Sequence, residues 1–159
     1  MKMKFTKMEG CGNDYVYVDG ISQKIDASLK PDLARRLSDR HFGIGGDGVI
    51  FINRSDIADF EMEMYNADGS RGEMCGNGIR CVGKYVYDKG YTTKTALRIE
   101  TLSGVKNVGL EVVGGHVERA TVDMGVARVD DAVLLNVDDT TVRCLPVSVG
   151  NPHAVIFLD

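Results

Sequence analysis

The residues best suited to chemistry are a cysteine and the glycine-rich turn after it, Cys75-Gly76-Asn77-Gly78. A turn-forming run at residues 66–70 precedes them, and an apolar, helix-like segment follows through Tyr87. The first backbone N–H groups of a helix have no partner inside the helix, so they can bind a carboxylate or stabilise a thiolate. Glycines lack Cβ atoms, which lets a ligand approach the backbone closely. The simpler alternative is a buried cysteine at an ordinary helix start.

Periodic patterns predict the elements that position this turn. Residues 77–88 carry apolar side chains at helical spacing and are expected to form the longest helix, with a shorter helix at 31–39. Alternation predicts a strand at 60–65 that leads into the cysteine turn. Further strands are expected at 1–8, 14–19, 49–53, 96–100, 105–113, 117–124, 141–149 and 154–158. Many strands around few helices indicate an α+β fold rather than a doubly wound sheet.

Composition argues against several classes of partner. A chain of 159 residues with 43% hydrophobic content can form a packed core. The net charge is −4 and the basic residues are scattered, which argues against nucleic acid as a partner. No apolar run approaches the roughly 20 residues of a membrane span, and no signal-peptide pattern opens the chain. We therefore expect a cytoplasmic protein with a small-molecule substrate and no membrane partner.

The four cysteines and the glycine-rich loop do not indicate a cofactor. The cysteines have no Cys-x-x-Cys spacing, so a metal site is not expected and the thiols are interpreted as free: Cys11, Cys75, Cys81 and Cys144. The loop at 42–48 lacks the lysine and the serine or threonine of a phosphate-binding loop. Nothing argues for the lysine Schiff base and phosphate site of pyridoxal phosphate. We expect neither metal nor cofactor.

Four stretches, in this order, resemble the diaminopimelate epimerase family. They read Lys-Met-Glu-Gly-Cys-Gly-Asn-Asp-Tyr at 7–15, Arg-His-Phe-Gly-Ile-Gly-Gly-Asp-Gly at 40–48, the cysteine motif at 66–81, and Gly-Asn-Pro-His at 150–153. The resemblance spans the chain, which covers about the first half of the family's length. It implies two pseudo-symmetric lobes, each a mixed β-sheet wrapped around a central helix, with the active site between them.

The resemblance also implies a division of the chain. Residues 1–115 are expected to form the first lobe, which carries the first catalytic cysteine, and 116–159 the opening strands of a truncated second lobe. A Gly-Asn pair precedes an apolar strand ending in Asp at both 12–19 and 150–159, which is consistent with an internal duplication. The family expectation for the full-length protein is a homodimer.

The activity implied is the cofactor-independent interconversion of LL- and meso-2,6-diaminopimelate in lysine and peptidoglycan-precursor biosynthesis. Cys75, as a thiolate, would remove the α-proton, while the N–H groups of Gly76 and Asn77 would hold the carboxylate as it becomes enolate-like. Inversion needs a second acid on the opposite face, which the family supplies as a cysteine from the second lobe. None of the other three cysteines matches that motif, so residues 1–159 alone are expected to be inactive.

The resemblance assigns further roles to one histidine and three asparagines. His153 matches the histidine that adjusts the cysteine, although a histidine opening a strand is commonly structural. Asn13, Asn66 and Asn151 match substrate-binding positions, although asparagine is also common in turns. Gly48 departs from members that carry glutamine there and offers no side chain.

Two other functions remain open from the sequence. One is another cofactor-independent amino-acid racemase or isomerase of the same fold, such as a proline racemase relative. The asparagine set favours diaminopimelate over that alternative, because a small substrate has no far end to hold. The other is a non-catalytic ligand-binding module.

Overall fold

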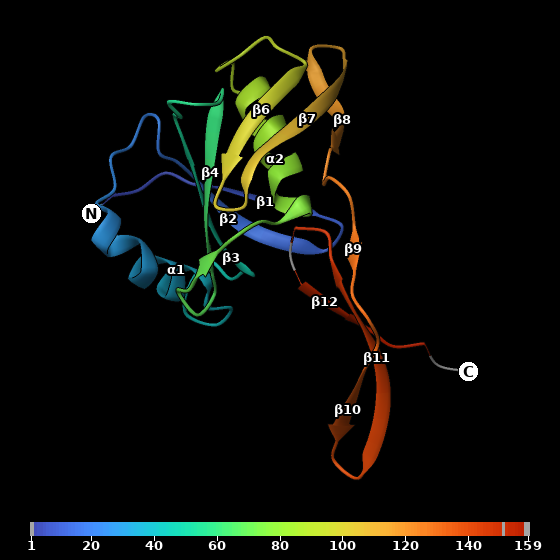
Figure 1. Cartoon of the computed structure of the whole chain (residues 1–159). Coiled ribbons are helices and arrows are strands. Elements are labelled where there is room, and N and C mark those ends of the chain that lie inside the picture. Colours follow the sequence, from blue (N-terminus) through green and yellow to red (C-terminus); the bar gives the residue numbers. More distant parts are fainter. Residues whose placement is uncertain (1, 151, 158–159) are drawn as a thin grey trace. The chain divides into compact units, whose positions relative to one another are not determined.

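The computed structural model describes residues 2–150 and 152–157, and the chain divides into two compact units (Figure 1). The units are Met1–Asp123 and Met124–Asp159. Strand β8 (His116–Val122) pairs with strand β7 (Gly104–Val113) in the sheet of the first unit. The division into lobes after residue 115 stays a prediction. That the units are lobes of one epimerase stays a prediction.

The first unit is one curled, mixed sheet with two α-helices. The strands run in the order β1-β2-β3-β4-β6-β7-β8, and β5 pairs with β4. The β2–β3 and β4–β6 pairs are parallel, while the other pairs are antiparallel. Besides β7 and β8, the elements of this unit are β1 (Thr6–Gly10), β2 (Asn13–Asp19), the short 3₁₀ helix η1 (Ala27–Leu29), α1 (Lys30–Ser38), β3 (Gly48–Asn53), β4 (Phe60–Asn66), β5 (Arg71–Gly72), α2 (Gly76–Asp88) and β6 (Ala96–Thr101).

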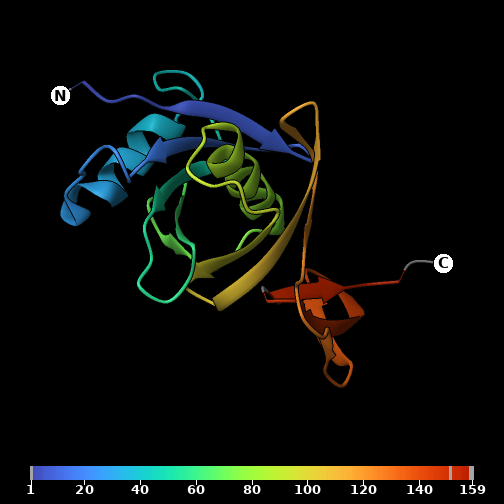
Figure 2. The same cartoon turned by 90° about the horizontal axis from the view of Figure 1, so that it is seen from above.

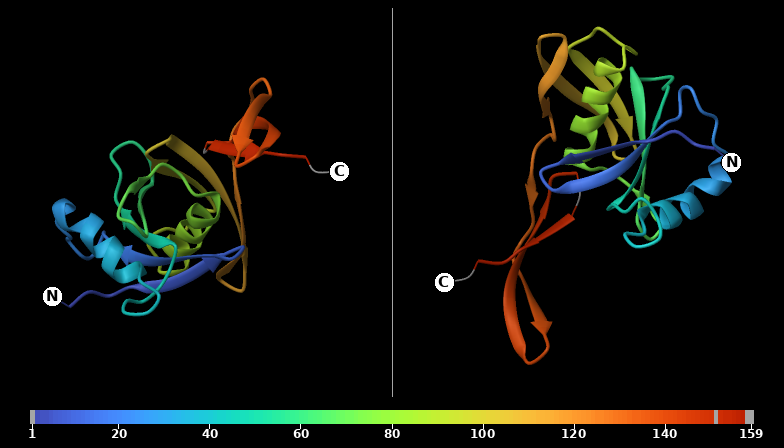
Figure 3. Two further views of the ribbon diagram at one scale, coloured as in Figure 1. Left: turned by 90° about the horizontal axis from the view of Figure 1, so that it is seen from below. Right: turned by 180° about the vertical axis from the view of Figure 1, so that it is seen from behind.

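Helix α2 lies inside the curl of this sheet and α1 lies outside it (Figures 2 and 3). Helix α2 contacts β1, β2, β7 and β8, whereas α1 contacts β2, β3 and β4. The expected α+β fold, a mixed sheet wrapped around a central helix, is therefore confirmed. Its consequence for function is that the start of α2 is held against the inner face of the sheet.

The central strands are buried on both faces because a helix covers each face. In β2 the residues Val16 and Val18 pack in one cluster with Ala34 of α1. The alternate residues Tyr15 and Tyr17 face the opposite side, and all four are buried. Strands covered on both faces read as continuous apolar runs, which is how β2 and β3 read in the sequence.

The predicted boundaries are mostly within two residues of the observed ones, with a clear error near each end of the chain. The strand expected at 154–158 is observed at Pro152–Val155, and residue 158 lies outside the described residues. The strand expected at 1–8 begins only at Thr6. Upstream of it, Lys4 pairs through its backbone N–H and C=O with the side chain of Gln23, so these groups are not available to a neighbouring strand. Gly114 and Gly115 form the hairpin turn between β7 and β8, and both residues have positive φ.

The second unit is a small antiparallel sheet. Its order is β10-β11-β12, with β9 paired to β11. The bounds are β9 (Arg128–Val129), β10 (Val133–Val137), β11 (Thr140–Ser148) and β12 (Pro152–Val155). Strand β10 was not predicted, because its side chains are all exposed and show no apolar alternation. Within the part of the chain that the structure describes, no helix is long and apolar enough to cross a membrane.

Candidate active site

Cys75 is the N-cap of helix α2. Its backbone is extended (φ −137°, ψ 111°), and its Sγ accepts a hydrogen bond from the Gly78 N–H at 3.3 Å. The thiol is free and half-buried. The N–H groups of Gly76 and Asn77 open the helix and have no carbonyl partner within it. The turn therefore combines a thiol with two N–H groups that are oriented to bind an anion.

Gly78 allows the sulfur to sit on the end of the helix. A Cβ at this position would lie 2.8 Å from Cδ1 of Ile50 and 3.5 Å from Sγ of Cys75. Ile50 is fully buried, so it has little room to move. A Cβ here would therefore press on the core at Ile50, while it would be in ordinary van der Waals contact with the thiol.

Asn77 and Asn13 form a hydrogen-bonded pair beside the cysteine. The Asn77 Nδ2 donates to Asn13 Oδ1 at 2.6 Å, although the two residues are far apart in the sequence. The Arg80 guanidinium donates to Asn77 Oδ1. Asn13 Nδ2 in turn donates to Asp47 Oδ2 at 3.1 Å. Asn13 is thus oriented from both ends of its amide, and each end keeps capacity for one further partner.

Asp47 is the acceptor that fixes the Asn13 end of β2. Besides the Asn13 amide, Asp47 Oδ2 accepts the backbone N–H of Asp14 at 3.2 Å. Arg40 donates to Asp47 Oδ1 at 3.0 Å and to Asp14 Oδ1 at 2.7 Å. Arg40, together with Lys7, holds the pKa of the Asp14 carboxyl well below its usual range. The glycine-rich loop therefore positions Asn13 through its acidic residue.

Asn66 lies on the same inner face of the sheet, two strands away from Asn13. Its register partner on β3 is Gly48, and the partner of Gly48 on β2 is Tyr15. Asn66 Nδ2 donates to Ser70 Oγ at 2.9 Å, and its backbone N–H donates to the Ser70 carbonyl at 2.9 Å. These bonds give Asn66 a role in its own turn, so its role in substrate binding stays a prediction.

Two tyrosines of β2, which the sequence analysis did not single out, also contact the cysteine turn. The Tyr17 hydroxyl donates to the Gly78 carbonyl at 3.4 Å. Tyr15 lies between Asn13 and Tyr17 on the same strand face, and burial and the neighbouring Cys75 thiol raise the pKa of the Tyr15 phenol above its usual value. The available signal was the alternation of Asn13, Tyr15 and Tyr17 along one strand face.

The other cysteines have different surroundings. Cys81 is buried, its thiol donates to the Glu9 carbonyl at 3.5 Å, and burial raises the pKa of this thiol. Cys144 is buried in the second unit. Cys11 is exposed and accepts a hydrogen bond from Arg80 at 3.3 Å. Of the three, none occupies a helix N-cap in the described residues.

His153 and Asn151 belong to the second unit. His153 is an exposed residue of β12, opposite Val147 of β11. The pairing of His153 with Cys75 stays a prediction. Asn151 lies outside the described residues. Within 2–150 and 152–157, no cluster of residues suited to binding a metal ion is found.

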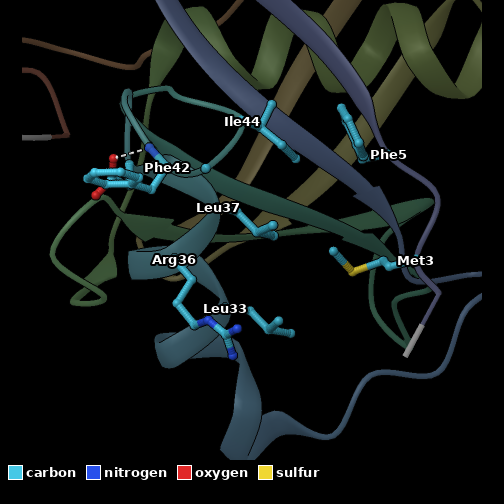
Figure 4. Close-up of a pocket in the computed structure, with 9 residues that line it drawn as sticks. Met3, Phe5, Leu33, Arg36, Leu37, Phe42 and Ile44 are labelled. Atoms are coloured by element: carbon cyan, nitrogen blue, oxygen red, sulfur yellow. Dashed lines mark hydrogen bonds between the residues drawn. The ribbon is translucent and has the colours of Figure 1, made fainter.

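A pocket of about 790 Å³ lies elsewhere on the first unit, between the N-terminal segment, α1 and the loop after α1 (Figure 4). Its lining is mostly apolar and includes Met3, Phe5, Leu33, Leu37 and Ile44. None of the predicted site residues lines it. The reactive and anion-binding groups therefore lie at the turn of Cys75 rather than in this pocket.

Comparisons with known proteins give one consistent family. Residues 5–129 match the family model described as diaminopimelate epimerase. A diaminopimelate epimerase of Leptospira biflexa is 49% identical over 174 residues, which cover 100% of this chain and 61% of that protein. One of Bacteroides thetaiotaomicron is 50% identical over 158 residues, covering 99% of this chain and 58% of that protein. The chain thus spans less than two thirds of the length of these relatives.

Solved structures show the same fold at low sequence identity. A probable proline racemase from Agrobacterium radiobacter has a TM-score of 0.78 at 15% identity, covering 98% of this chain and 52% of that one. A hydroxyproline epimerase from Agrobacterium vitis has a TM-score of 0.74 at 16% identity, covering 97% and 51%. At such identities the likeness establishes the fold and does not select a substrate.

Proposed function

This chain belongs to the diaminopimelate epimerase family, and we propose that it forms part of a cofactor-independent enzyme that interconverts LL- and meso-2,6-diaminopimelate. The observation that carries the proposal is the position of Cys75, at the N-cap of α2 and beside the Asn13–Asn77 pair. The identity of about half to named diaminopimelate epimerases supports the substrate. The reaction belongs to lysine and peptidoglycan-precursor biosynthesis.

The chemistry begins with the removal of an α-proton. Cys75 accepts the proton as a thiolate, and the electron pair left on the α-carbon spreads into the carboxylate. The N–H groups of Gly76 and Asn77 bind this carboxylate as its charge increases. Delocalisation of the negative charge into the carboxylate still leaves the α-carbon a weak acid. The hydrogen bonds from the two N–H groups to the carboxylate must therefore become stronger as the carbanion forms.

Inversion is completed by a proton delivered to the opposite face. Cys81 is buried and its thiol pKa is raised, so it is unsuited to this role. We assign the second transfer to a cysteine outside these 159 residues, and we assign the adjustment of Cys75 to His153. Asn13, Asn66 and Asn151 would hold the amino and carboxylate groups at the far end of the substrate.

The same family membership underlies three further parts of the proposal. We propose that the complete enzyme acts in the cytoplasm, as a homodimer, without metal or organic cofactor. A polypeptide of residues 1–159 by itself is expected not to invert diaminopimelate, because it supplies one of the two thiols. Substantial turnover by this polypeptide would contradict the two-cysteine mechanism.

The test is hydrogen exchange at the α-carbons. Residues 1–159 are joined to the remaining part of the Leptospira biflexa relative, and the chimera is incubated with LL-diaminopimelate in heavy water. We expect deuterium at one centre, and Cys75→Ala to lower its incorporation by at least ~10³-fold, as for loss of a catalytic base. The unmodified relative serves as the positive control. A folded, reduced chimera that exchanges other amino acids, but not this one, would overturn the substrate assignment.

A further inference from the structure

Three alternate residues of β2 face the start of helix α2. The first is Asn13, whose Oδ1 accepts a hydrogen bond from Asn77. The third is Tyr17, whose hydroxyl donates to the Gly78 carbonyl. Alternate side chains of a strand lie on one face, so Tyr15 between them faces the same turn, where Cys75 is the N-cap.

The ring of Tyr15 is fixed by its surroundings. The side chain is only 6% exposed and packs edge-on against Tyr17, with the ring centroids 6.5 Å apart. A Cβ on Gly48, the register partner of Tyr15, would lie 3.0 Å from the Tyr15 ring and 2.1 Å from the Tyr65 carbonyl. The glycine at 48, which departs from glutamine-bearing family members, thus leaves space that the tyrosine ring uses.

We propose that the Tyr15 hydroxyl donates a hydrogen bond to the Cys75 thiolate, so that Tyr15 is a positioning residue for the base. A thiol ionises before a phenol, at about pH 8.5 against about 10 for free side chains, so the phenol keeps its proton when the thiolate forms. With this bond the sulfur would have a second donor besides the Gly78 N–H, which donates to it at 3.3 Å. Hydrogen bonds to a charged form favour that form.

Two observations support this direction of donation. The pKa of Tyr15 is raised by burial and by Cys75, which keeps the phenol protonated. Asp14 and Asp47 also interact electrostatically with Tyr15 and act in the same direction. Tyr17 and Cys81 are further titratable groups that interact with Cys75, and burial raises the pKa of each. The value of this arrangement for catalysis rests on the proposed function, but the hydrogen bond itself does not.

The test measures how fast iodoacetamide alkylates Cys75 in the 159-residue chain as a function of pH, with each cysteine followed by peptide mass spectrometry. In Tyr15→Phe we expect the midpoint of the Cys75 profile to rise by about one pH unit, which is a roughly tenfold loss of rate on its acidic side. Tyr17→Phe is the matched control, since its hydroxyl bonds a carbonyl rather than the sulfur, and its profile should stay near wild type. An unshifted profile in folded Tyr15→Phe overturns the proposal.

A second measurement does not depend on the folding of Tyr15→Phe. Tyrosine labelled with ¹³C at Cζ reports on the phenol oxygen by NMR in the wild-type chain. The Tyr15 signal should shift as Cys75 ionises, and this shift should be absent in Cys75→Ala. A Tyr15 signal that does not respond to Cys75 ionisation would contradict the hydrogen bond.

The two proposals fail in different ways. If Tyr15→Phe moves the alkylation profile but the chimera exchanges no diaminopimelate, the hydrogen bond stands and the function is wrong. If the chimera exchanges diaminopimelate through Cys75 but Tyr15→Phe leaves the alkylation profile unchanged, the function stands and the inference about Tyr15 is wrong.

Discussion

Helix α2 carries two cysteines with opposite surroundings, one in front of its first turn and one in its middle. Cys75 is half-buried, accepts an N–H from the helix and lies beside polar groups of β2. Cys81 is buried, donates to a backbone carbonyl and is desolvated, so its thiol pKa is raised. The residue type is the same, so the position along the helix decides whether a thiol meets the free N–H end of the helix or fills the core.

The largest expected effect is a difference in reactivity between these two thiols. In the folded chain, iodoacetamide at pH 8 should modify Cys75 at least ~10³-fold faster than Cys81, because Cys81 reacts only when the core opens, which costs several kcal/mol. Peptide mass spectrometry over time measures both rates. In urea the two rates should become similar, and a comparable rate in the native chain would show that the burial of Cys81 does not protect it.

The sequence predicted the position of Cys75 at a helix start, but it did not predict how deeply Cys81 is buried. The glycines after Cys75 and the apolar spacing through Val86 predicted a helix start at the cysteine, and α2 begins at Gly76. The depth of Cys81 depends on β1, whose Glu9 carbonyl it reaches. Such a contact joins segments 72 residues apart in the sequence, and local periodicity carries no information about it.

The same reason explains which site residues were missed. Asn13 and Asn77 were both assigned to the site through the family resemblance, but their hydrogen bond to each other was not foreseen. Asp47 was read as part of a glycine-rich loop, yet it orients Asn13. Tyr15 was placed in the strand expected at 14–19 and was given no role at the site. Each of these roles follows from β2 lying against α2, which the order of residues along the chain does not specify.

The next prediction compares two glycines of α2, Gly78 in the first turn beside Cys75 and Gly83 in the middle of the helix near Cys81. In Gly78→Ala the new Cβ would lie 2.8 Å from Ile50 in a buried site, and such overpacking costs about 1–3 kcal/mol. Alanine gains roughly 1 kcal/mol in helix propensity, so we expect a net destabilisation of up to about 2 kcal/mol. Gly83→Ala is the matched control in the middle of α2, where a Cβ would lie 3.0 Å from Leu110 Cδ2.

Chemical denaturation measures both stabilities, and alkylation separates the two positions. Gly78→Ala should also change the alkylation rate of Cys75, because the new Cβ would lie 3.5 Å from its sulfur. Gly83→Ala should leave that rate unchanged. Equal changes in Cys75 reactivity for both variants would show that Gly78 has no particular influence on the environment of the Cys75 thiol.

A smaller effect concerns the polar support on the Cys75 side. Asp47→Asn should cost about 1 kcal/mol of stability, because it weakens hydrogen bonds from Asn13 and the Asp14 N–H to a charged acceptor that is partly exposed. The side-chain NH₂ signals of Asn13 in NMR should move with it. The exposed Asp56→Asn is the control for charge alone, and unchanged Asn13 signals in Asp47→Asn would show that Asp47 does not orient this amide.

The smallest effect is a pH dependence that belongs to Cys81 alone. Its folded-state pKa is raised by burial, so its contribution to stability is fully present below the unfolded thiol pKa of about 9 and is lost as pH rises towards the folded value. The urea midpoint of the wild-type chain should therefore fall between about pH 8.5 and 10. In Cys81→Ala the midpoint is lower at neutral pH, because a cavity forms, but it should fall less over this range.

Tyrosines whose pKa is raised in the folded state also reduce stability near the top of this range, because they ionise there in the unfolded chain of both proteins, so the difference between the two urea curves isolates the thiol. Cys11→Ala serves as the control, because Cys11 is exposed and its removal should leave the wild-type slope intact. Parallel curves for wild type and Cys81→Ala would mean that Cys81 ionises equally easily in the folded and unfolded chain. The contrast between the middle of α2 and its first turn would then rest on access to the thiols rather than on their ionisation.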